Sequence, residues 1–284
     1  MDVGHAVKDL TRRFQAAGIE TARLDARVLL AHVMEISAER VFGYPETVLT
    51  DAQISCLSSL SERRSNREPL ARVVGEKEFW SLPFQLSNDT LVPRPETETV
   101  VEAVLDQLVN RHAAVRVLDM GTGSGCLLIS LLSELSYGVG VGVDISDGAL
   151  RIAKENASRN GVGERAQFIQ NDWCQGLADV VDDNFDIIIS NPPYIPFSEI
   201  ETLEPEVSKH EPRRALDGGE DGLDFYRSLL HDTQNLLGPT GVLALEIGWD
   251  QAASVEDLGR REGLRLLDKR RDLAGIARCV VFSN

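Results

Sequence analysis

The second part of the chain alternates apolar runs of strand length with longer helical patterns, and this alternation constrains the fold more than any other feature. Strands are expected at Val115–Met120, Gly138–Asp144, Ala166–Ile169, Phe185–Ser190 and Gly241–Gly248, and two more at Leu264–Leu267 and Cys279–Phe282. Helices are expected at Gly125–Leu135, Ser146–Asn160 and Leu223–Leu237, the last one stopped by Gly238-Pro239. Such alternation is typical of a parallel sheet covered by helices on both faces. We therefore predict an α/β fold with a doubly wound, seven-stranded, mostly parallel sheet.

The first part of the chain has a different pattern. Residues 1–70 predict a small bundle of short amphipathic helices, including Ala22–Met34 and a helix that begins near Asp51 as its N-cap. No cluster of catalytic residue types is evident there, which favours a recognition or structural role. Strand-forming residues, among them Val73 and Val74, are punctuated by Gly75 and Pro83 and predict a β-hairpin within residues 71–92. The expected domains are thus 1–70, the hairpin linker 71–92, and 93–284.

Charge and cysteine content limit the function. The formal net charge is −16, and nearly all of the acidic excess lies in residues 91–284. A field of that sign repels phosphate backbones, so we expect no direct nucleic-acid partner, although a local basic patch remains possible. The four cysteines form no C-x-x-C pair, which suggests a reducing, cytoplasmic setting. No run is long enough for a membrane span, the N-terminus does not read as a signal peptide, and the five histidines show no metal-ligand spacing.

A glycine-rich loop follows the first strand of the sheet. It reads Gly121-Thr122-Gly123-Ser124-Gly125 and opens a helix, so a ligand can approach its backbone closely. The dinucleotide-binding pattern G-x-G-x-x-G would need glycine where this chain has Cys126, which disfavours a dehydrogenase. No lysine follows the loop, which removes a P-loop ATPase.

Two further strand ends carry suitable side chains for a nucleoside. Asp144 ends the second strand about 20 residues after the glycine-rich loop, at the distance where a carboxylate accepts from ribose hydroxyls. Asp172 and Trp173 follow the third strand and offer a carboxylate and an aromatic plane. The structural alternatives are a helix-capping role for Asp144, beside Ser146, and a core position for Trp173. Ligands of open α/β sheets bind at the carboxyl ends of strands, so these positions together favour a nucleoside site.

The fourth strand runs into Asn191-Pro192-Pro193-Tyr194. The two prolines stiffen the backbone, Asn191 offers an amide, Pro192 keeps a free carbonyl, and Tyr194 adds an aromatic wall. This combination predicts a pocket for a flat group that carries an NH2, whereas the alternative is an ordinary rigid turn. From these residues alone, adenine or guanine amino groups and a glutamine side chain all remain candidates.

Several segments in order resemble the release factor glutamine methyltransferase family, a subgroup of the class I S-adenosylmethionine-dependent methyltransferases. They are EKEFW (76–80), PRPETE (93–98), DMGTGSG (119–125), NPPY (191–194), DGGEDGLDFYR (217–227) and LEIGWDQ (245–251). The chain departs from the pattern at 71–73, where an aromatic residue is expected before the EKEFW segment. The role of Arg94 within PRPETE is left unassigned.

The resemblance implies S-adenosylmethionine as cofactor and the glutamine of a Gly-Gly-Gln motif in peptide chain release factors as substrate, with the N-terminal helices helping to dock that partner. The implied cofactor residues are Gly121, Thr122, Gly123, Ser124, Gly125, Asp144, Asp172, Trp173 and Asn191. The implied substrate residues are Asn191, Pro192, Pro193 and Tyr194, of which Asn191, Pro192 and Tyr194 are the catalytic candidates. Asn191 and the Pro192 carbonyl would accept the two N–H groups of the amide, and Tyr194 would pack against the amide plane. No metal and no membrane are implied. A methyltransferase of DNA or rRNA amino groups and a non-catalytic cofactor-binding module are the alternatives.

Overall fold

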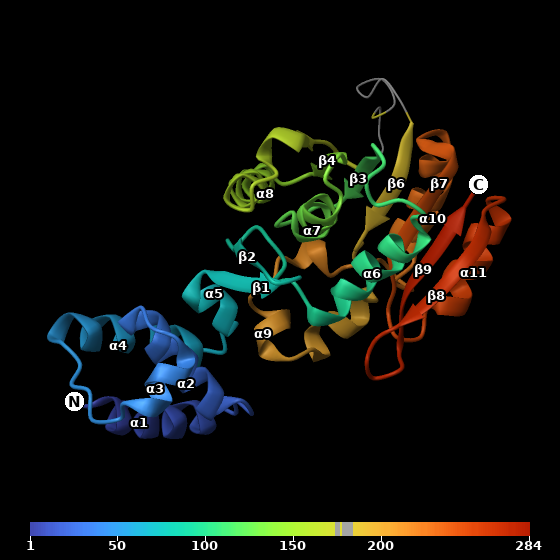
Figure 1. The fold of residues 1–284 in the computed structure, drawn as a ribbon. Coiled ribbons are helices and arrows are strands. Elements are labelled where there is room, and N and C mark those ends of the chain that lie inside the picture. The colour runs from blue at the N-terminus through green and yellow to red at the C-terminus, as the bar shows by residue number, and fades with distance from the viewer. Residues whose placement is uncertain (174–176, 178–183) are drawn as a thin grey trace. The chain divides into compact units, whose positions relative to one another are not determined.

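The computed structural model describes residues 1–173, 177 and 184–284, which form two compact units (Figure 1). Met1–Glu76 and Glu204–His210 make up the first, which we call the helical unit. Lys77–Leu203 and Glu211–Asn284 make up the second, which we call the sheet unit. Among the described residues, no helix has both the length and the apolar composition needed to cross a membrane.

The helical unit is built from short helices around one apolar core. Its elements are α1 (Val3–Ala16), α2 (Ala22–Met34), α3 (Ala38–Gly43), α4 (Asp51–Ser65), α5 (Leu70–Val74) and α9 (Pro205–Ser208). Phe14, Leu29 and Leu30 are fully buried in its core. The predicted helix Ala22–Met34 is confirmed. The predicted N-cap Asp51 is wrong by one residue, because Thr50 forms a reciprocal capping box with Gln53 and Asp51 is already helical.

A buried ion network joins α9 to the rest of the helical unit. Arg64 Nε lies 2.7 Å from Asp25 Oδ2, and Arg64 Nη1 lies 2.9 Å from Glu206 Oε1. Arg67 Nε donates to the same Glu206 oxygen at 2.7 Å. A short segment from the later part of the chain is therefore an integral part of the helical unit, which the sequence pattern did not indicate.

The hairpin is shorter than predicted. Strands β1 (Glu76–Phe79) and β2 (Leu82–Gln85) form a two-stranded sheet, so a hairpin is present. The prediction that Val73 and Val74 belong to a strand is wrong: they end α5, which begins after Pro69 and stops at Gly75 in the left-handed conformation. The turn residues Trp80 and Ser81 both have positive φ, as a two-residue hairpin turn requires.

The sheet unit contains a seven-stranded sheet in the order β5-β4-β3-β6-β7-β9-β8. Its strands are β3 (Arg116–Met120), β4 (Val139–Asp144), β5 (Ala166–Gln170), β6 (Phe185–Ser190), β7 (Leu237–Glu246), β8 (Arg265–Arg271) and β9 (Ala277–Ser283). All neighbours are parallel except β9, which runs antiparallel to β7 and β8. The predicted α/β fold with a mostly parallel seven-stranded sheet is confirmed.

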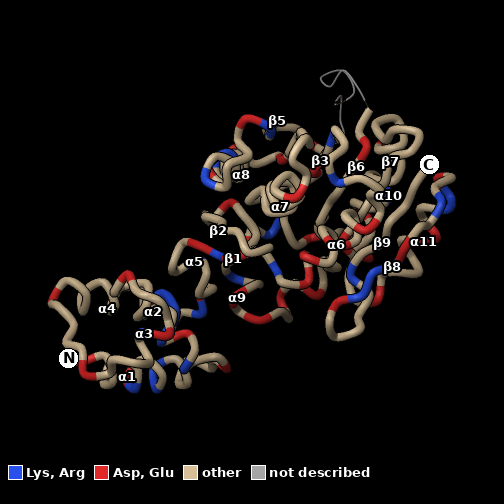
Figure 2. Tube along the Cα trace, viewed as in Figure 1, with Lys and Arg blue, Asp and Glu red and all other residues tan. Residues whose placement is uncertain are grey.

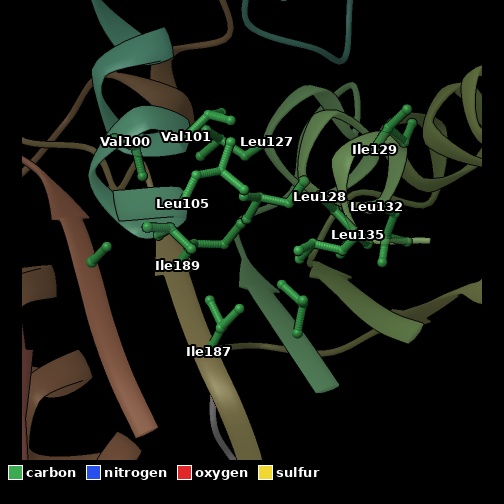
Figure 3. Close-up of a cluster of buried hydrophobic side chains, with 14 of the residues drawn as sticks. Val100, Val101, Leu105, Leu127, Leu128, Ile129, Leu132, Leu135, Ile187 and Ile189 are labelled. Carbon is green, nitrogen blue, oxygen red and sulfur yellow. The ribbon is translucent and has the colours of Figure 1, made fainter. Parts of the chain in front are cut away.

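Helices cover both faces of this sheet because its central strands are apolar on both sides. On one face, α6 (Glu98–Gln107) and α7 (Cys126–Glu134) pack on Ile187 and Ile189 of β6 (Figure 3). On the other face, α10 (Asp224–Asp232) and α11 (Ala252–Arg261) share a core with Ile188. The remaining helix, α8 (Asp147–Arg159), contacts β4 and β5.

The predicted boundary between α10 and β7 is wrong. The helix expected at Leu223–Leu237 ends at Asp232, and a short 3-10 turn, Thr233–Asn235, follows it. Strand β7 already begins at Leu237 and includes Gly238 and Pro239, which were predicted to lie before the strand. The pairing of β7 with β6 is irregular between Phe185 and Ile187, and an irregularity of this kind admits a proline that cannot donate to the ladder.

Candidate active site

The strand register brings the predicted site residues to one edge of the sheet. Met120, the last residue of β3, is level with Val143 of β4 and with Ser190 of β6. Ser190 is in turn level with Leu245 of β7. The chain positions that follow these residues therefore emerge side by side at the carboxyl edge of the sheet, where open α/β folds bind ligands.

A pocket of about 440 Å³ lies at this edge, within the roughly 300–1,000 Å³ usual for small-molecule sites. Of the predicted residues, those that line it are Gly121, Thr122, Gly123, Ser124, Asp144, Asp172, Trp173, Asn191 and Pro193. Gly125, Pro192 and Tyr194 are not part of its lining. Among the lining residues that were not predicted as site residues are Arg94, Thr97, Asp119, Arg214 and Phe225.

The glycine-rich loop forms one wall of the pocket through its backbone. Gly121 has φ +73°, and a Cβ atom there would lie 3.2 Å from Cη2 of the Trp173 ring. Gly125 has φ +80° and caps the start of α7, where a Cβ atom would lie 2.8 Å from Cδ1 of Ile129. The first glycine thus admits the Trp173 ring, and the second admits close packing of α7.

Asp144 holds the glycine-rich loop in place. Its Oδ2 accepts a hydrogen bond from the Gly123 N–H at 2.9 Å, and its Oδ1 accepts one from the Ser146 N–H at 2.9 Å. Burial raises the pKa of the Asp144 carboxyl, and these backbone hydrogen bonds act in the opposite direction. Each carboxylate oxygen has a second lone pair, so Asp144 retains acceptors for a ligand. The helix cap itself is formed by Ser146, whose hydroxyl accepts from Ala149 N–H.

Asp119 is a second carboxylate of the pocket and was not predicted as a site residue. It is 1% exposed, its Oδ2 accepts from the Thr122 hydroxyl at 2.6 Å, and burial raises its pKa to about 7. Among the described residues its buried Oδ1 has no hydrogen-bond partner. A buried acceptor without a partner is costly, and this one lines a pocket where a ligand could donate to it. The signal was present in the sequence, since Asp119 stands near the end of a strand just as Asp144 does.

An aromatic pair forms another wall. The Trp173 and Phe225 rings have their centroids 4.7 Å apart and are tilted by 41°. Trp173 has φ +52°, an uncommon conformation for a large residue, and Phe225 comes from the start of α10. The structural alternative for Trp173 was a core position, and its ring does pack against the apolar cluster of that face while it also lines the pocket.

Asn191 lies at the pocket with its side chain directed to Thr97. Its Nδ2 donates to the Thr97 hydroxyl oxygen at 3.4 Å. The Tyr194 hydroxyl donates to Glu246 Oε1 at 3.4 Å, and burial raises the pKa of Tyr194. Glu246 is 2% exposed, and burial raises the pKa of its carboxyl to about 7, although Thr97 and Tyr194 act in the opposite direction.

Hydrogen bonds of Gln251 link the segments DGGEDGLDFYR and LEIGWDQ to the Asn191–Tyr194 loop. Gln251 Nε2 donates to the backbone oxygens of Tyr194 at 2.9 Å and Gly222 at 3.1 Å. Gln251 Oε1 accepts from Gly248 N–H at 2.9 Å and from the Tyr226 hydroxyl at 3.4 Å. One buried amide therefore ties together the loops after β6 and β7 and the loop before α10.

Two arginines bring positive charge to this pocket of an acidic chain. Arg94 is 40% exposed, and its Nη2 lies 3.3 Å from Oε1 of Glu211, whose side chain is fully buried. Arg214 lowers the pKa of Asp144 through its charge. Across residues 1–173, 177 and 184–284, no group of three or more His, Cys, Asp or Glu side chains has the geometry to hold a metal ion.

Comparisons with known proteins agree over most of the chain. The family described as "PrmC N-terminal domain" matches residues 5–75, and the family described as "Methyltransferase domain" matches residues 111–258. A "Release factor glutamine methyltransferase" of Rhodospirillum rubrum is 44% identical over 95% of this chain and 81% of its own length. A protein of the same name from Caulobacter vibrioides is 41% identical over 97% of this chain and 93% of its own length.

Solved structures share the fold at low sequence identity. The hMettl16 catalytic domain, solved in complex with the MAT2A 3'UTR hairpin 1, has a TM-score of 0.60 at 15% identity, over 82% of this chain and 81% of its own. A methyltransferase from Pyrococcus furiosus has a TM-score of 0.53 at 17% identity, over 78% of this chain and 98% of its own. At this level of identity the likeness concerns the fold alone.

Proposed function

Because the chain belongs to the release factor glutamine methyltransferase family, we propose that it transfers a methyl group from S-adenosylmethionine to the side-chain amide nitrogen (N5) of the glutamine in the Gly-Gly-Gln motif of peptide chain release factors. The observation that carries the proposal is the Asn191 side chain at a nucleoside-sized pocket, which lies at the ends of β3, β4, β5 and β6.

The residues of the pocket fit S-adenosylmethionine. The Gly121–Gly125 backbone allows close approach, Asp144 offers acceptors for ribose hydroxyls, and the Trp173–Phe225 pair offers a face for adenine. Asp119 Oδ1, which has no hydrogen-bond partner among the described residues, matches a donor on the ligand. When bound, S-adenosylmethionine supplies an electrophilic methyl group on a positively charged sulfur.

Positioning of the substrate amide is the task of Asn191 and Pro192. An amide nitrogen is a poor nucleophile because its lone pair is delocalised, so it must be held with its π-face toward the methyl group. Asn191 Oδ1 and the Pro192 carbonyl are proposed to accept its two N–H groups, which fixes this orientation and stabilises the positive charge that develops on nitrogen. In the transfer, the nitrogen would gain the methyl group as the methyl–sulfur bond breaks and the sulfur leaves as a neutral thioether. The nitrogen would afterwards release one proton to solvent, so no general base is needed before the transfer.

Tyr194 and Pro193 are proposed to support this arrangement differently from each other. Pro193 lines the pocket, whereas the Tyr194 hydroxyl donates a hydrogen bond to Glu246 Oε1. We propose that the hydroxyl contact of Tyr194 helps to hold the loop, and that its ring packs on the substrate amide.

We propose that the helical unit helps to dock the release factor. This proposal keeps the predicted division of the chain into residues 1–70, the hairpin linker 71–92 and residues 93–284. Phe42 and Tyr44 are 69% and 56% exposed, and the guanidinium groups of Arg27 and Arg40 lie over their rings at 5.1 and 6.0 Å. Exposed aromatic and arginine side chains are enriched in protein interfaces. If this surface docks the partner, Phe42→Ala with Tyr44→Ala raises KM for whole release factor and leaves KM for a short Gly-Gly-Gln peptide unchanged. An equal KM for whole release factor in the variant and the wild type would exclude this surface.

The acidic sheet unit supports a protein substrate over DNA or rRNA. Figure 2 shows Asp and Glu distributed along its trace among helices and loops. Such a surface disfavours phosphate backbones. We infer no direct nucleic-acid or membrane partner, and a cytoplasmic location because the substrate is a translation factor.

The test is transfer of labelled methyl from S-adenosylmethionine to purified release factor and, in parallel, to DNA and rRNA. Label is expected in release factor alone and is expected to disappear when the Gly-Gly-Gln glutamine is changed to alanine. Label in nucleic acid alone would favour the amino-methyltransferase alternative. Label that survives the glutamine substitution would exclude the proposed acceptor.

A further inference from the structure

A groove within the helical unit is lined by residues of α1, α2 and α3. Its volume is about 690 Å³, larger than the 440 Å³ of the pocket at the carboxyl edge of the sheet. Its buried apolar floor includes Val3 of α1 and Val41 of α3, which are 1% and 3% exposed. The half-buried Val7 and the exposed Phe42 and Pro45 extend this apolar lining. The groove therefore offers an apolar surface on which a side chain of a partner can pack.

Four cations also line this groove, which we call the basic groove. Lys8 and Arg12 are four residues apart on α1, and Arg23 and Arg27 are four residues apart on α2, so each pair lies on one face of its helix. Among the described residues, no Asp or Glu lines the groove, and only Arg12 of the four has an ion pair, with Asp9. In a chain whose formal net charge is −16, such a concentration of positive charge indicates a negatively charged partner.

Contacts within the helical unit fix the shape of the basic groove. Gly4 N–H donates to Pro45 O at 2.8 Å, which joins the start of α1 to the chain after α3. A Cβ atom at Gly4 would lie 3.3 Å from the same oxygen, so glycine suits this close approach. The guanidinium carbon of Arg27 lies 5.1 Å from the centroid of the Phe42 ring. A lining that is already ordered lowers the entropic cost of binding a partner.

We propose that the basic groove docks an acidic segment of the release factor, with carboxylates of that segment paired to the four cations and an apolar side chain packed on the floor. This inference rests on the proposed function and goes beyond it, because it names the chemistry of the segment that docks. The groove shares Phe42 with the exposed aromatic surface that was proposed above for docking.

An RNA strand fits the basic groove less well than an acidic protein segment does. Single-stranded nucleic acids bind on aromatic platforms where successive bases stack, whereas the buried floor of this groove is aliphatic. The excess of acidic residues in the chain also repels an extended polyanion, while a short acidic segment is attracted locally.

The first test compares Arg23→Glu with the matched control Lys154→Glu in the full-length protein. Each variant reverses one exposed helical cation, Arg23 in the groove and Lys154 on α8 outside it. Arg23 lies in the first turn of α2, where a carboxylate is favourable, so the variant is expected to fold. Arg23→Glu is expected to raise KM for whole release factor about 3- to 10-fold with kcat near the wild-type value, and Lys154→Glu is expected to leave KM unchanged. Equal KM in Arg23→Glu and wild type would overturn the inference.

Salt dependence gives a second readout, which a merely structural role of these residues would not move. Raising the ionic strength from about 0.01 M to 0.1 M shortens the Debye length from about 30 Å to about 10 Å, so wild-type KM for release factor is expected to rise. The rise is expected to be smaller when Lys8→Glu and Arg23→Glu are combined, because two positive and two negative charges then cancel in the groove. An equal rise in this double variant and wild type would contradict charge pairing in the groove.

Fluorescence anisotropy separates this inference from the proposed function. A fluorescein-labelled amphipathic peptide of glutamate and leucine is expected to bind the wild-type protein and to bind the double variant at least about 10-fold more weakly. Equal affinity for the two proteins would overturn the inference, and so would a polyuridine RNA that binds wild type and loses affinity in the double variant. If wild-type protein does not methylate release factor, the proposed function fails. If it does, with the same KM in the double variant, only the present inference fails.

Discussion

Gln251 offers the sharpest test of how the loop at Asn191–Tyr194 is held. Its amide donates to the backbone oxygens of Tyr194 and Gly222 and accepts from Gly248 N–H, all at 2.9–3.1 Å, and it is 8% exposed. Gln251→Ala removes these three hydrogen bonds together and leaves three backbone groups without their partner.

The structure gives the size of the effect. A buried hydrogen bond contributes about 1 kcal/mol net, and more where the partner stays unsatisfied, so three bonds correspond to roughly 3 kcal/mol of unfolding free energy. Gln251→Glu is expected to be worse than Gln251→Ala at neutral pH, because its carboxylate would oppose the two backbone oxygens that Gln251 Nε2 now serves. Turnover is expected to fall in both variants, since the loop that carries Asn191 loses its support.

Urea denaturation followed by tryptophan fluorescence reports the unfolding of the sheet unit, which contains Gln251, because all three tryptophans belong to this unit. The matched control is Asp250→Ala at the neighbouring exposed position, for which a change within about 0.5 kcal/mol is expected. A Gln251→Ala variant as stable as this control, or a Gln251→Glu variant more stable than Gln251→Ala, would refute the reasoning.

Three further predictions concern the pocket. Asn191→Ala is expected to leave S-adenosylmethionine affinity, measured by calorimetry, largely intact while it lowers kcat by about 100-fold or more; unchanged kcat would exclude its proposed role. Asp144→Ala is expected to weaken S-adenosylmethionine binding, since it removes both the ribose acceptor and the hydrogen bond to Gly123 N–H; equal affinity in the same calorimetric assay would contradict that. Burial raises the Asp119 pKa from 3.8 to about 7, so the folded state holds this proton more tightly than the unfolded state, and the associated stability is lost as pH rises from about 4 to 7. Asp119→Asn is therefore expected to show a smaller loss of stability over that pH range in urea denaturation, and an identical pH dependence in variant and wild type would count against a buried, proton-binding Asp119.

Much of the site could be predicted because it follows strand ends. Gly121, Asp144 and Asn191 each come directly after or at the end of an apolar strand, and parallel register brings such positions together without any knowledge of side-chain contacts. Phe225 could not be found in this way, because it comes from the start of a helix whose placement depends on the tertiary fold.

The supporting residues escaped prediction for a related reason. Thr97 contacts Asn191 and Glu246 contacts Tyr194, but both residues lie far from that loop in the sequence and approach it only in the folded chain. The local sequence pattern also assigned Val73 to a strand and placed Pro239 before the strand, and both assignments were wrong. The strand propensity of Val73 was overridden by the helix that begins after Pro69, and an irregular strand pair accommodated Pro239.

The most direct measurement of the central claim is mass spectrometry of release factor after incubation with this protein and S-adenosylmethionine. The account predicts one added methyl group, located by fragmentation on the side chain of the Gly-Gly-Gln glutamine, and none after incubation with the Asn191→Ala variant under the same conditions. A methyl group on any other residue, or an unmodified glutamine with active wild-type protein, would contradict it.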